Sequence, residues 1–192
     1  TLLRLFVLGT AVPLAAARRA LERLAVDIAA VAGCLRVAGD EVNATLRITP
    51  SEGVLIAFDR REPGEREAGD FVMGPSDTGR LLAAATSRRP CKTGLDLGTG
   101  AGMHALLLAR HSADVVATDV NPRAVAFTEL NAKLNRIGNV AALAGDMFAP
   151  VAERRFDRIV SNPPFVISPE DRLVYLSGGM KADGFCRRLA GE

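Results

Sequence analysis

From residue 71 onward, the sequence alternates short apolar segments with longer amphipathic ones, and this alternation constrains the fold most. Four segments have the composition of short strands: residues 93–98, 113–120, 139–146 and 155–162. Three segments before or between them are predicted to be helices: residues 74–89, 102–111 and 121–138. Pro122 lies in the first turn of the last helix and Gly138 ends it. Strand–helix alternation of this kind predicts an α/β fold with a parallel, doubly wound sheet.

The bulk composition is that of a folded cytoplasmic protein. The chain has 192 residues, 48% of them hydrophobic, enough for one full domain or for a small domain plus part of another. No apolar run reaches about 18 residues and no signal-peptide pattern opens the sequence, so we expect neither a membrane span nor a membrane partner. Cys34, Cys91 and Cys186 fit no disulfide or zinc spacing, and two histidines are too few for a histidine-based metal site. We therefore expect no bound metal.

Charge says little about partners. The net charge is +2; residues 1–70 carry 9 Arg, no Lys and 10 acidic residues, for a net −1, and residues 71–192 carry a net +3. Neither part is strongly basic, so any contact with nucleic acid must come from a local patch. Arg18, Arg19 and Arg23 lie on one predicted helix and form one candidate patch for phosphates, although such arginines are more often a solvated helix face.

The first 70 residues are predicted to fold differently from the rest. Residues 13–33 are an alanine-rich helical pattern, residues 41–48 alternate as a strand, and residues 53–58 read as its partner. Helices followed by a β-ribbon predict a winged-helix-like α+β module over residues 1–58, with a plain helical cap as the alternative. Residues 59–70, of which eight in twelve are charged, are predicted to be a linker. The α/β domain then covers residues 71–192.

A glycine-rich turn joins the first strand of this domain to its helix, in "DLGTGAGMH" at residues 96–104. Gly98, Gly100 and Gly102 allow a tight turn and a close approach to a ligand, and the following helix points free N–H groups at it. An anionic group, either a pyrophosphate or an amino-acid carboxylate, suits such a turn. A dinucleotide fingerprint would need glycine at position 103, which is Met103, so the spacing argues against that class. A tight turn without a ligand is the alternative.

Two acids follow the next strands. Asp119 ends the second strand, 21 positions after Gly98, where its carboxylate can accept from both ribose hydroxyls of an adenosine-type cofactor. The alternative is that Asp119 only caps the helix that begins at Asn121-Pro122, although Asn121 is itself a plausible cap. Asp146 ends the third strand and can accept from an adenine amine, with Met147 and Phe148 packing on the ring. A simple turn aspartate is the alternative there.

Together, "DLGTGAG", "ATDVNP", "AGDMF" and "SNPPF" resemble the class I S-adenosylmethionine-dependent methyltransferases over roughly residues 71–190. More narrowly they are similar to the branch with an Asn-Pro-Pro-aromatic motif. This branch includes release-factor glutamine, adenine and cytosine amino, and ribosomal-RNA guanine amino methyltransferases. The resemblance implies a Rossmann-like fold and S-adenosyl-L-methionine as cofactor. The cofactor contacts it implies are Asp96, Gly98, Thr99, Gly100, Gly102, Asp119, Asn121, Asp146, Met147 and Asn162.

The resemblance also implies a catalytic role for Asn162, Pro163, Pro164 and Phe165. The branch methylates planar NH2 groups whose lone pair is delocalised. The Asn162 side-chain oxygen and the Pro163 carbonyl would each accept one N–H, which orients the nitrogen and favours its nucleophilic form. The two prolines stiffen the corner. Phe165 would stack on the substrate and stabilise the developing cation, without a metal ion.

The sequence departs from the family pattern in length. The family sheet has seven strands and only four are predicted here, and the chain starts at Thr1, so we expect a domain that lacks its C-terminal strands. For the substrate we expect RNA, specifically ribosomal RNA, then a protein glutamine, then DNA. Two other functions remain open: a nucleic-acid-binding regulator that senses the cofactor without turnover, and a nicotinamide oxidoreductase. Met103 and the Asn-Pro-Pro-Phe motif both count against the oxidoreductase.

Overall fold

The computed structural model describes residues 1–21, 26, 30, 33–61, 69–163 and 184–191. These residues belong to two compact units. The first consists of Thr1–Thr49 with Ala57–Glu65, and the second of Pro50–Ile56 with Arg66–Glu192. Each unit has its own hydrophobic core.

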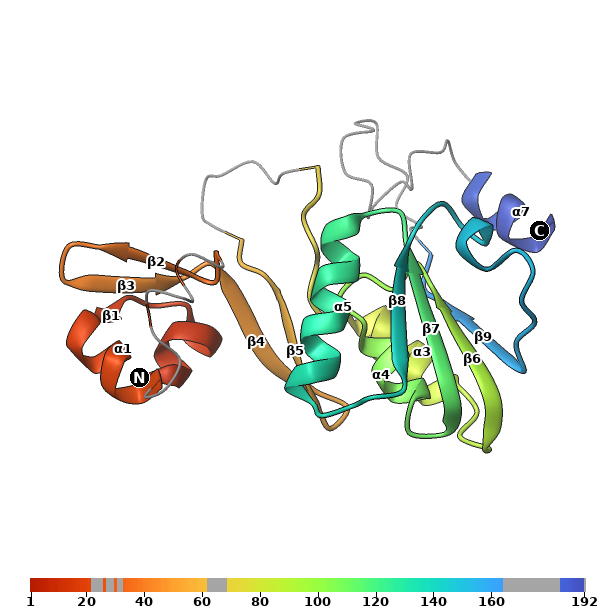
Figure 1. The fold of residues 1–192 in the computed structure, drawn as a ribbon, viewed down its shortest axis with the longest axis horizontal. Helices are drawn as coiled ribbons and strands as arrows, with labels where there is room; N and C mark the ends of the chain where they lie inside the picture. Colours follow the sequence, from red (N-terminus) through yellow and green to blue (C-terminus); the bar gives the residue numbers. More distant parts are fainter. Residues whose placement is uncertain (22–25, 27–29, 31–32, 62–68, 164–183, 192) are drawn as a thin grey trace. The chain divides into compact units, whose positions relative to one another are not determined.

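The first unit packs two helices against a small antiparallel sheet (Figure 1). Its elements are η1 (Leu3–Leu8, a π-helix), β1 (Val12–Pro13), α1 (Leu14–Leu21), β2 (Leu35–Ala38) and β3 (Glu41–Ala44), with strand order β1-β3-β2. Its core contains Leu5, Val12, Ala17, Leu35 and Val42. The predicted helix over residues 13–33 lies partly outside the described residues, and the winged-helix module stays a prediction.

The predicted strand over residues 41–48 is interrupted. β3 ends at Ala44, and β4 (Leu46–Ser51) pairs instead with β5 (Val54–Asp59). Thr45 lies at the bend between them: its hydroxyl donates to the carbonyl of Gly33, and its N–H donates to the carbonyl of Cys34 at 3.1 Å. These long-range bonds turn the chain where the alternation of the sequence predicts a continuous strand.

The second unit contains a four-stranded parallel sheet in the order β8-β7-β6-β9 (Figure 1). The strands are β6 (Cys91–Leu97), β7 (Ser112–Asp119), β8 (Val140–Ala144) and β9 (Arg158–Ser161). The helices are α3 (Asp77–Ala85), α4 (Met103–Leu108), α5 (Pro122–Leu134), η2 (Ala149–Val151) and α7 (Gly184–Gly191). This arrangement confirms the predicted Rossmann-like α/β fold of the domain.

The two faces of this sheet bury different partners because successive side chains of a strand point to opposite faces. Leu95, Leu97 and Val116 face a cluster with Met147 and Val151, which Leu189 of α7 also joins. Val115 and Ala117 of β7 face a second cluster, built with Ala105 and Leu108 of α4 and Leu82 of α3. Asp96, between Leu95 and Leu97, therefore lies on the face that carries α4.

The parallel strands bring their carboxyl ends to one edge of the sheet. Leu97 at the end of β6 is in register with Thr118 of β7 and Ser161 of β9, and Asp119 is in register with Ala144 of β8. The four segments that were singled out in the sequence follow these positions directly. In the described part of the chain, β9 pairs with β6 alone, and its Ile159 is 50% exposed.

No helix among the described residues is long and apolar enough to cross a membrane.

Candidate functional site

The glycine turn after β6 is held by the next strand. The N–H groups of Gly98 and Thr99 both donate to the carbonyl of Thr118, at 2.9 Å each. Gly98, Gly100 and Gly102 have φ values of +72°, +55° and +84°, a left-handed region that other residues enter at a cost. At Gly102 a Cβ atom would also lie 2.9 to 3.1 Å from three atoms of Thr128. Glycine at this position is therefore required by packing as well as by the backbone.

Asp119 ties the end of β7 to this turn. Its Oδ2 accepts from the N–H of Gly100 at 2.8 Å, and its Oδ1 accepts from the N–H of Asn121 at 2.9 Å. Burial raises the pKa of Asp119, and the backbone bonds from Asn121, Gly100 and Val120 partly oppose this rise. Each carboxylate oxygen can accept more than one hydrogen bond, so the fixed carboxylate retains capacity for further donors.

Asn121 has a structural role in this geometry. Its side-chain oxygen accepts from the N–H of Arg123 at 2.9 Å and so caps α5, and its Nδ2 donates to the carbonyl of Asp70 at 2.8 Å. The capping role that the sequence analysis left open thus belongs to Asn121, beside Asp119. A contact between Asn121 and a cofactor stays a prediction.

Asp96 is completely buried beneath the glycine turn. Its Oδ2 accepts from the Thr99 hydroxyl at 2.7 Å and from the N–H of Ala105 at 2.9 Å. Its Oδ1 has no hydrogen-bond partner among the described residues. Burial raises the pKa of Asp96, while the nearby charge of His104 acts in the opposite direction. An unpaired carboxylate oxygen in this place is suited to a cationic donor.

Asp146 and Met147, which follow β8, lie at the same edge. Asp146 Oδ2 accepts from Nη1 of Arg188 at 2.6 Å, an ion pair with α7. Met147 is 6% exposed and packs in the core cluster with Leu95 and Leu97. The predicted contacts of Asp146 and Met147 with an adenine group stay predictions.

Asn162 and Pro163 follow β9 and are half-buried. Ser161, just before them, donates its hydroxyl to the carbonyl of Leu97 at 2.9 Å, which fastens the end of β9 to the end of β6. The side chain of Asn162 has no hydrogen-bond partner among the described residues. Pro164 and Phe165 lie outside the described residues.

Two residues that support the turn were not recognised from the sequence. Thr128 donates its hydroxyl to the carbonyl of Gly100 at 3.2 Å, and Asn131 donates Nδ2 to the carbonyl of Ala101 at 2.8 Å. Both side chains belong to α5 and are fully buried. The sequence does place Thr128 and Asn131 three positions apart, on one face of the predicted helix. Because buried polar groups are nearly always hydrogen-bonded, such a pair on a buried face indicates bonds to a neighbouring segment.

A scan against known families assigns the second unit. The model of the methyltransferase small domain matches residues 66–175, more than half of the chain. The chain belongs to the methyltransferase small domain family. A second model, for a domain of unknown function (DUF7059), matches residues 1–45. The family and the parallel sheet together make residues 66–175 a class I S-adenosylmethionine-dependent methyltransferase domain, as the four motifs predicted.

Curated relatives match this chain in sequence over part of their length. Release factor glutamine methyltransferase of Geobacter sulfurreducens is 33% identical over 160 residues, which cover 72% of this chain and 56% of that relative. The protein of the same name from Escherichia coli is 39% identical over 102 residues, which cover 50% of this chain and 36% of the relative. The chain thus spans about half or less of the length of these methyltransferases.

Solved structures match as well. Trm5b from Pyrococcus abyssi has a TM-score of 0.49 and 23% identity, over 68% of this chain and 39% of that one. The ribosomal protein L11 methylase of Lactobacillus delbrueckii subsp. bulgaricus has a TM-score of 0.42 and 30% identity, over 47% and 48% of the two chains.

The methyltransferase family implies S-adenosylmethionine as cofactor, and the residues present fit it on two counts. The Cβ positions of Gly98 and Gly100 meet no atom of the described residues within 4 Å, so this part of the structure leaves the space beside the turn open to a ligand. The unpaired Oδ1 of Asp96 lies directly beneath the turn and can accept from an ammonium group. Among the described residues, no group of three or more His, Cys, Asp or Glu could hold a metal ion.

Proposed function

We propose that the chain carries the cofactor and amine sites of an S-adenosylmethionine-dependent N-methyltransferase that acts on a planar, conjugated NH2 group. The observation that carries this proposal is the position of Asn162. It follows β9 at the edge that carries the glycine turn and Asp119, and its side-chain amide has no partner among the described residues. A hydrogen-bonding side chain left unpaired at this edge is consistent with an external donor.

The cofactor would be held by residues of three strand ends. When bound, S-adenosylmethionine supplies an electrophilic methyl group on a sulfonium. The Gly98–Gly102 turn provides room for it, Asp96 accepts from its ammonium group, and Asp119 accepts from ribose hydroxyls. Asp146 retains the lone pairs of Oδ1 for an exocyclic amine, because Arg188 engages Oδ2. Thr128 and Asn131 keep the turn in shape without contacting the cofactor.

The amine would be oriented by the corner after β9. The side-chain oxygen of Asn162 and the carbonyl of Pro163 each accept one of its two N–H groups, which aims the nitrogen lone pair at the transferred methyl. The bond between Ser161 and Leu97 fixes this corner relative to the glycine turn. The roles predicted for Pro164 and Phe165 belong to the same corner and are part of the proposal.

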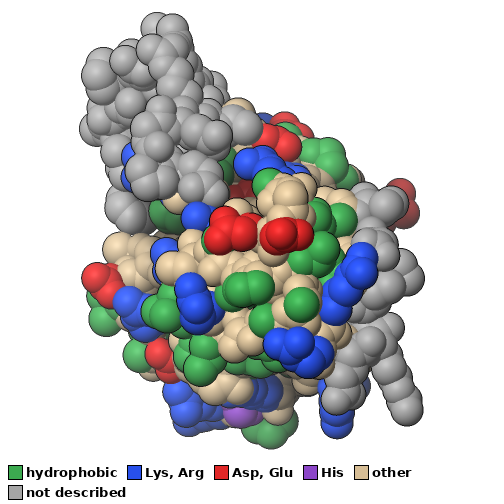
Figure 2. All heavy atoms as spheres, turned by 90° about the vertical axis from the view of Figure 1, so that its left-hand side faces the viewer, with side chains coloured by type: hydrophobic (Ala, Val, Ile, Leu, Met, Phe, Trp, Pro, Cys, Tyr) green, Lys and Arg blue, Asp and Glu red, His purple; other side chains and the backbone are tan. Residues whose placement is uncertain are grey.

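Of the candidate substrates, a protein glutamine is now the best supported. The sequence analysis ranked ribosomal RNA first because of the winged-helix-like front block, which stays a prediction. On the face drawn in Figure 2, Arg and Lys side chains are interspersed with acidic and hydrophobic ones, which does not favour a phosphate backbone. The relatives from Geobacter sulfurreducens and Escherichia coli are named for a release-factor glutamine. RNA is the second candidate, and a cytoplasmic location stays a prediction.

The test is transfer of labelled methyl groups from S-adenosylmethionine to release factors and to ribosomal RNA, with Asn162→Ala beside the unchanged chain. We expect transfer to one substrate, and a loss of at least about 100-fold in the variant with cofactor affinity little changed. Asn139→Ala is the matched control. Asn139 Nδ2 donates to the carbonyls of Ala109 and Ser112, both at 3.0 Å, before and at the start of β7. Its loss should lower the melting temperature and spare transfer.

Full activity in Asn162→Ala would overturn the assigned amine-orienting role. Cofactor binding without transfer to protein or RNA would favour the regulator that only senses the cofactor.

A further inference from the structure

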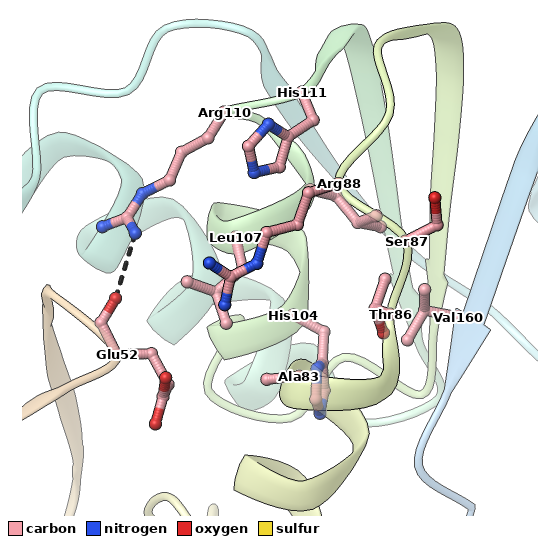
Figure 3. Close-up of a pocket in the computed structure, with 11 residues that line it drawn as sticks. Glu52, Ala83, Thr86, Ser87, Arg88, His104, Leu107, Arg110, His111 and Val160 are labelled. Atoms are coloured by element: carbon pink, nitrogen blue, oxygen red, sulfur yellow. Dashed lines mark hydrogen bonds between the residues drawn. The ribbon is translucent and has the colours of Figure 1, made fainter.

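A cavity of about 200 Å³ lies on the face of the sheet that carries α4. Its walls come from the segment after α3, from α4 and the residues that follow it, and from Val160 of β9 (Figure 3). Arg88 stands three positions before β6 and His111 directly before β7, so this part of the cavity lies at the amino ends of these strands. The cofactor edge is at their carboxyl ends. The charged end of the cavity is therefore distinct from the cofactor edge, while His104 and Val160 form the part of its lining nearest to that edge in the chain.

The cavity is rich in unneutralised positive charge. Arg88 lines it with no hydrogen-bond or ion-pair partner in the described part of the chain, and in the view of Figure 3 its side chain lies between His104 and His111. Arg110 also lines it and is held in place by the carbonyls of Glu52, at 3.0 Å, and Gly53, at 2.7 Å. Carbonyls fix a guanidinium group but do not cancel its charge.

Arg158 adds an independent sign of a missing anion. It precedes Val160 by two positions on β9, so both side chains lie on the same face of the sheet. Its Nη2 is 3.5 Å from the hydroxyl of Ser87, which lines the cavity. Its Nη1 is buried and has no acceptor among the described residues. A buried guanidinium N–H without an acceptor is costly, and an oxyanion beside Ser87 would supply one.

The size and the charge of the cavity restrict the class of ligand that it can bind. A cavity of about 200 Å³ is smaller than the ~300 Å³ at which sites for drug-sized ligands begin. Arg88 and Arg110 line the cavity, and Arg158 adjoins it through Ser87. These three guanidinium groups exceed the one carboxylate of the lining, that of Glu52, by two positive charges, which matches a phosphate monoester with about −1.5 to −2 at neutral pH. Ala83, Leu107 and Leu108 supply an apolar wall for a small organic body.

We propose that the cavity between α3 and α4 binds a small phosphate monoester, with its phosphate against Arg88, Arg158 and Arg110. His111 provides a further donor at the rim, and His104, 8% exposed, forms the inner wall. The site is independent of the methyltransferase reaction, because none of these residues belongs to the proposed cofactor or amine site.

The test is calorimetric titration of the whole chain with inorganic phosphate, with ribose 5-phosphate and with ribose. We expect saturable binding of the two phosphates, tighter for ribose 5-phosphate because of its organic body, and none of ribose. Arg88→Glu should weaken binding by more than about tenfold. Arg89→Glu makes the same charge change one residue away, outside the cavity lining, and should leave binding within about twofold.

Arg158→Gln is the second variant, and it should also weaken phosphate binding. Binding of S-adenosylmethionine, measured in the same samples, reports whether each variant is folded. Absence of saturable binding by either phosphate overturns the proposal. So does equal weakening by Arg88→Glu and Arg89→Glu, which would indicate general attraction to a basic surface.

Discussion

Asp119 shows at the residue scale how one carboxylate serves structure and ligand together. Its Oδ2 accepts from the N–H of Gly100 and its Oδ1 from the N–H of Asn121. These two bonds fix the carboxylate, so its remaining lone pairs point in a fixed direction. In Asp96 both hydrogen bonds, from Thr99 and Ala105, go to Oδ2, and Oδ1 has no partner among the described residues. We assign both acids to the cofactor in their ionised form, in which the remaining lone pairs carry negative charge.

This dependence predicts a pH effect on cofactor affinity. Burial raises the pKa of both Asp119 and Asp96 above the ordinary value of 3.8. A raised pKa means that the proton binds at a higher pH, so acceptors are lost, and affinity for S-adenosylmethionine should fall, as the pH drops from about 7 toward 4. Calorimetric titration across this range checks the prediction.

Asp119→Asn is the control for this pH effect. It should bind weakly at every pH and show a smaller pH dependence, because one of the two titrating groups is gone. Constant affinity of the unchanged chain down to pH 4 would contradict the assigned roles of both acids.

At the element scale, the glycine turn is a loop whose shape is set by α5. Thr128 and Asn131 hold the carbonyls of Gly100 and Ala101 from α5, which begins only at Pro122. Two hydrogen bonds thus join the helix to the turn, and we expect cofactor affinity to depend on Thr128 and Asn131 through the shape of the turn.

Two glycines of this turn should respond differently to alanine. Gly102→Ala combines a positive φ with a Cβ contact of 3.1 Å to the Cα of Thr128, which cannot move aside like a side chain. We expect it to cost about 2–4 kcal/mol of stability. The added methyl group of Gly100→Ala meets no atom of the described residues within 4 Å, so this variant should cost only about 1 kcal/mol, from its φ of +55°. Denaturant unfolding of the two variants gives the comparison.

For cofactor binding we expect the opposite order, with Gly100→Ala as the variant that loses affinity without losing its fold. A methyl group at Gly100 enters the open space that we assign to the cofactor, so Gly100→Ala should weaken S-adenosylmethionine binding in a protein that remains folded. Equal losses of stability in the two variants would mean that packing against Thr128 does not limit the turn.

At the scale of the whole molecule, the turn of the β4–β5 hairpin, residues 50–56, makes its side-chain hydrogen bonds within the second unit. The backbone N–H and carbonyl of Leu55 bond the side chain of Asn135, at 2.8 and 2.7 Å, much as a neighbouring strand would. Arg110 holds the carbonyls of Glu52 and Gly53 in the turn. Residues 50–56 accordingly group with the second unit, although the sequence pattern assigns them to the front module.

The parts of the fold that could be predicted are those that depend on local pattern. Strand–helix alternation predicted the parallel sheet, and the motifs at strand ends predicted one shared edge, because parallel strands end together. Contacts between distant segments could not be predicted. The bend at Thr45 depends on Gly33 and Cys34, and the support of the turn by Asn131 depends on the packing of α5. The unpaired oxygen of Asp96 likewise appears only once its neighbours are placed.

The central claim is that the edge formed by β6, β7, β8 and β9 binds S-adenosylmethionine. Calorimetric titration of the 192-residue chain with S-adenosylmethionine, and with NAD in parallel, tests it most directly. We predict saturable binding of S-adenosylmethionine with a single site, and no binding of NAD, because Met103 occupies the position of the third glycine in a dinucleotide fingerprint. Binding of NAD in place of S-adenosylmethionine, or of neither, would contradict the claim.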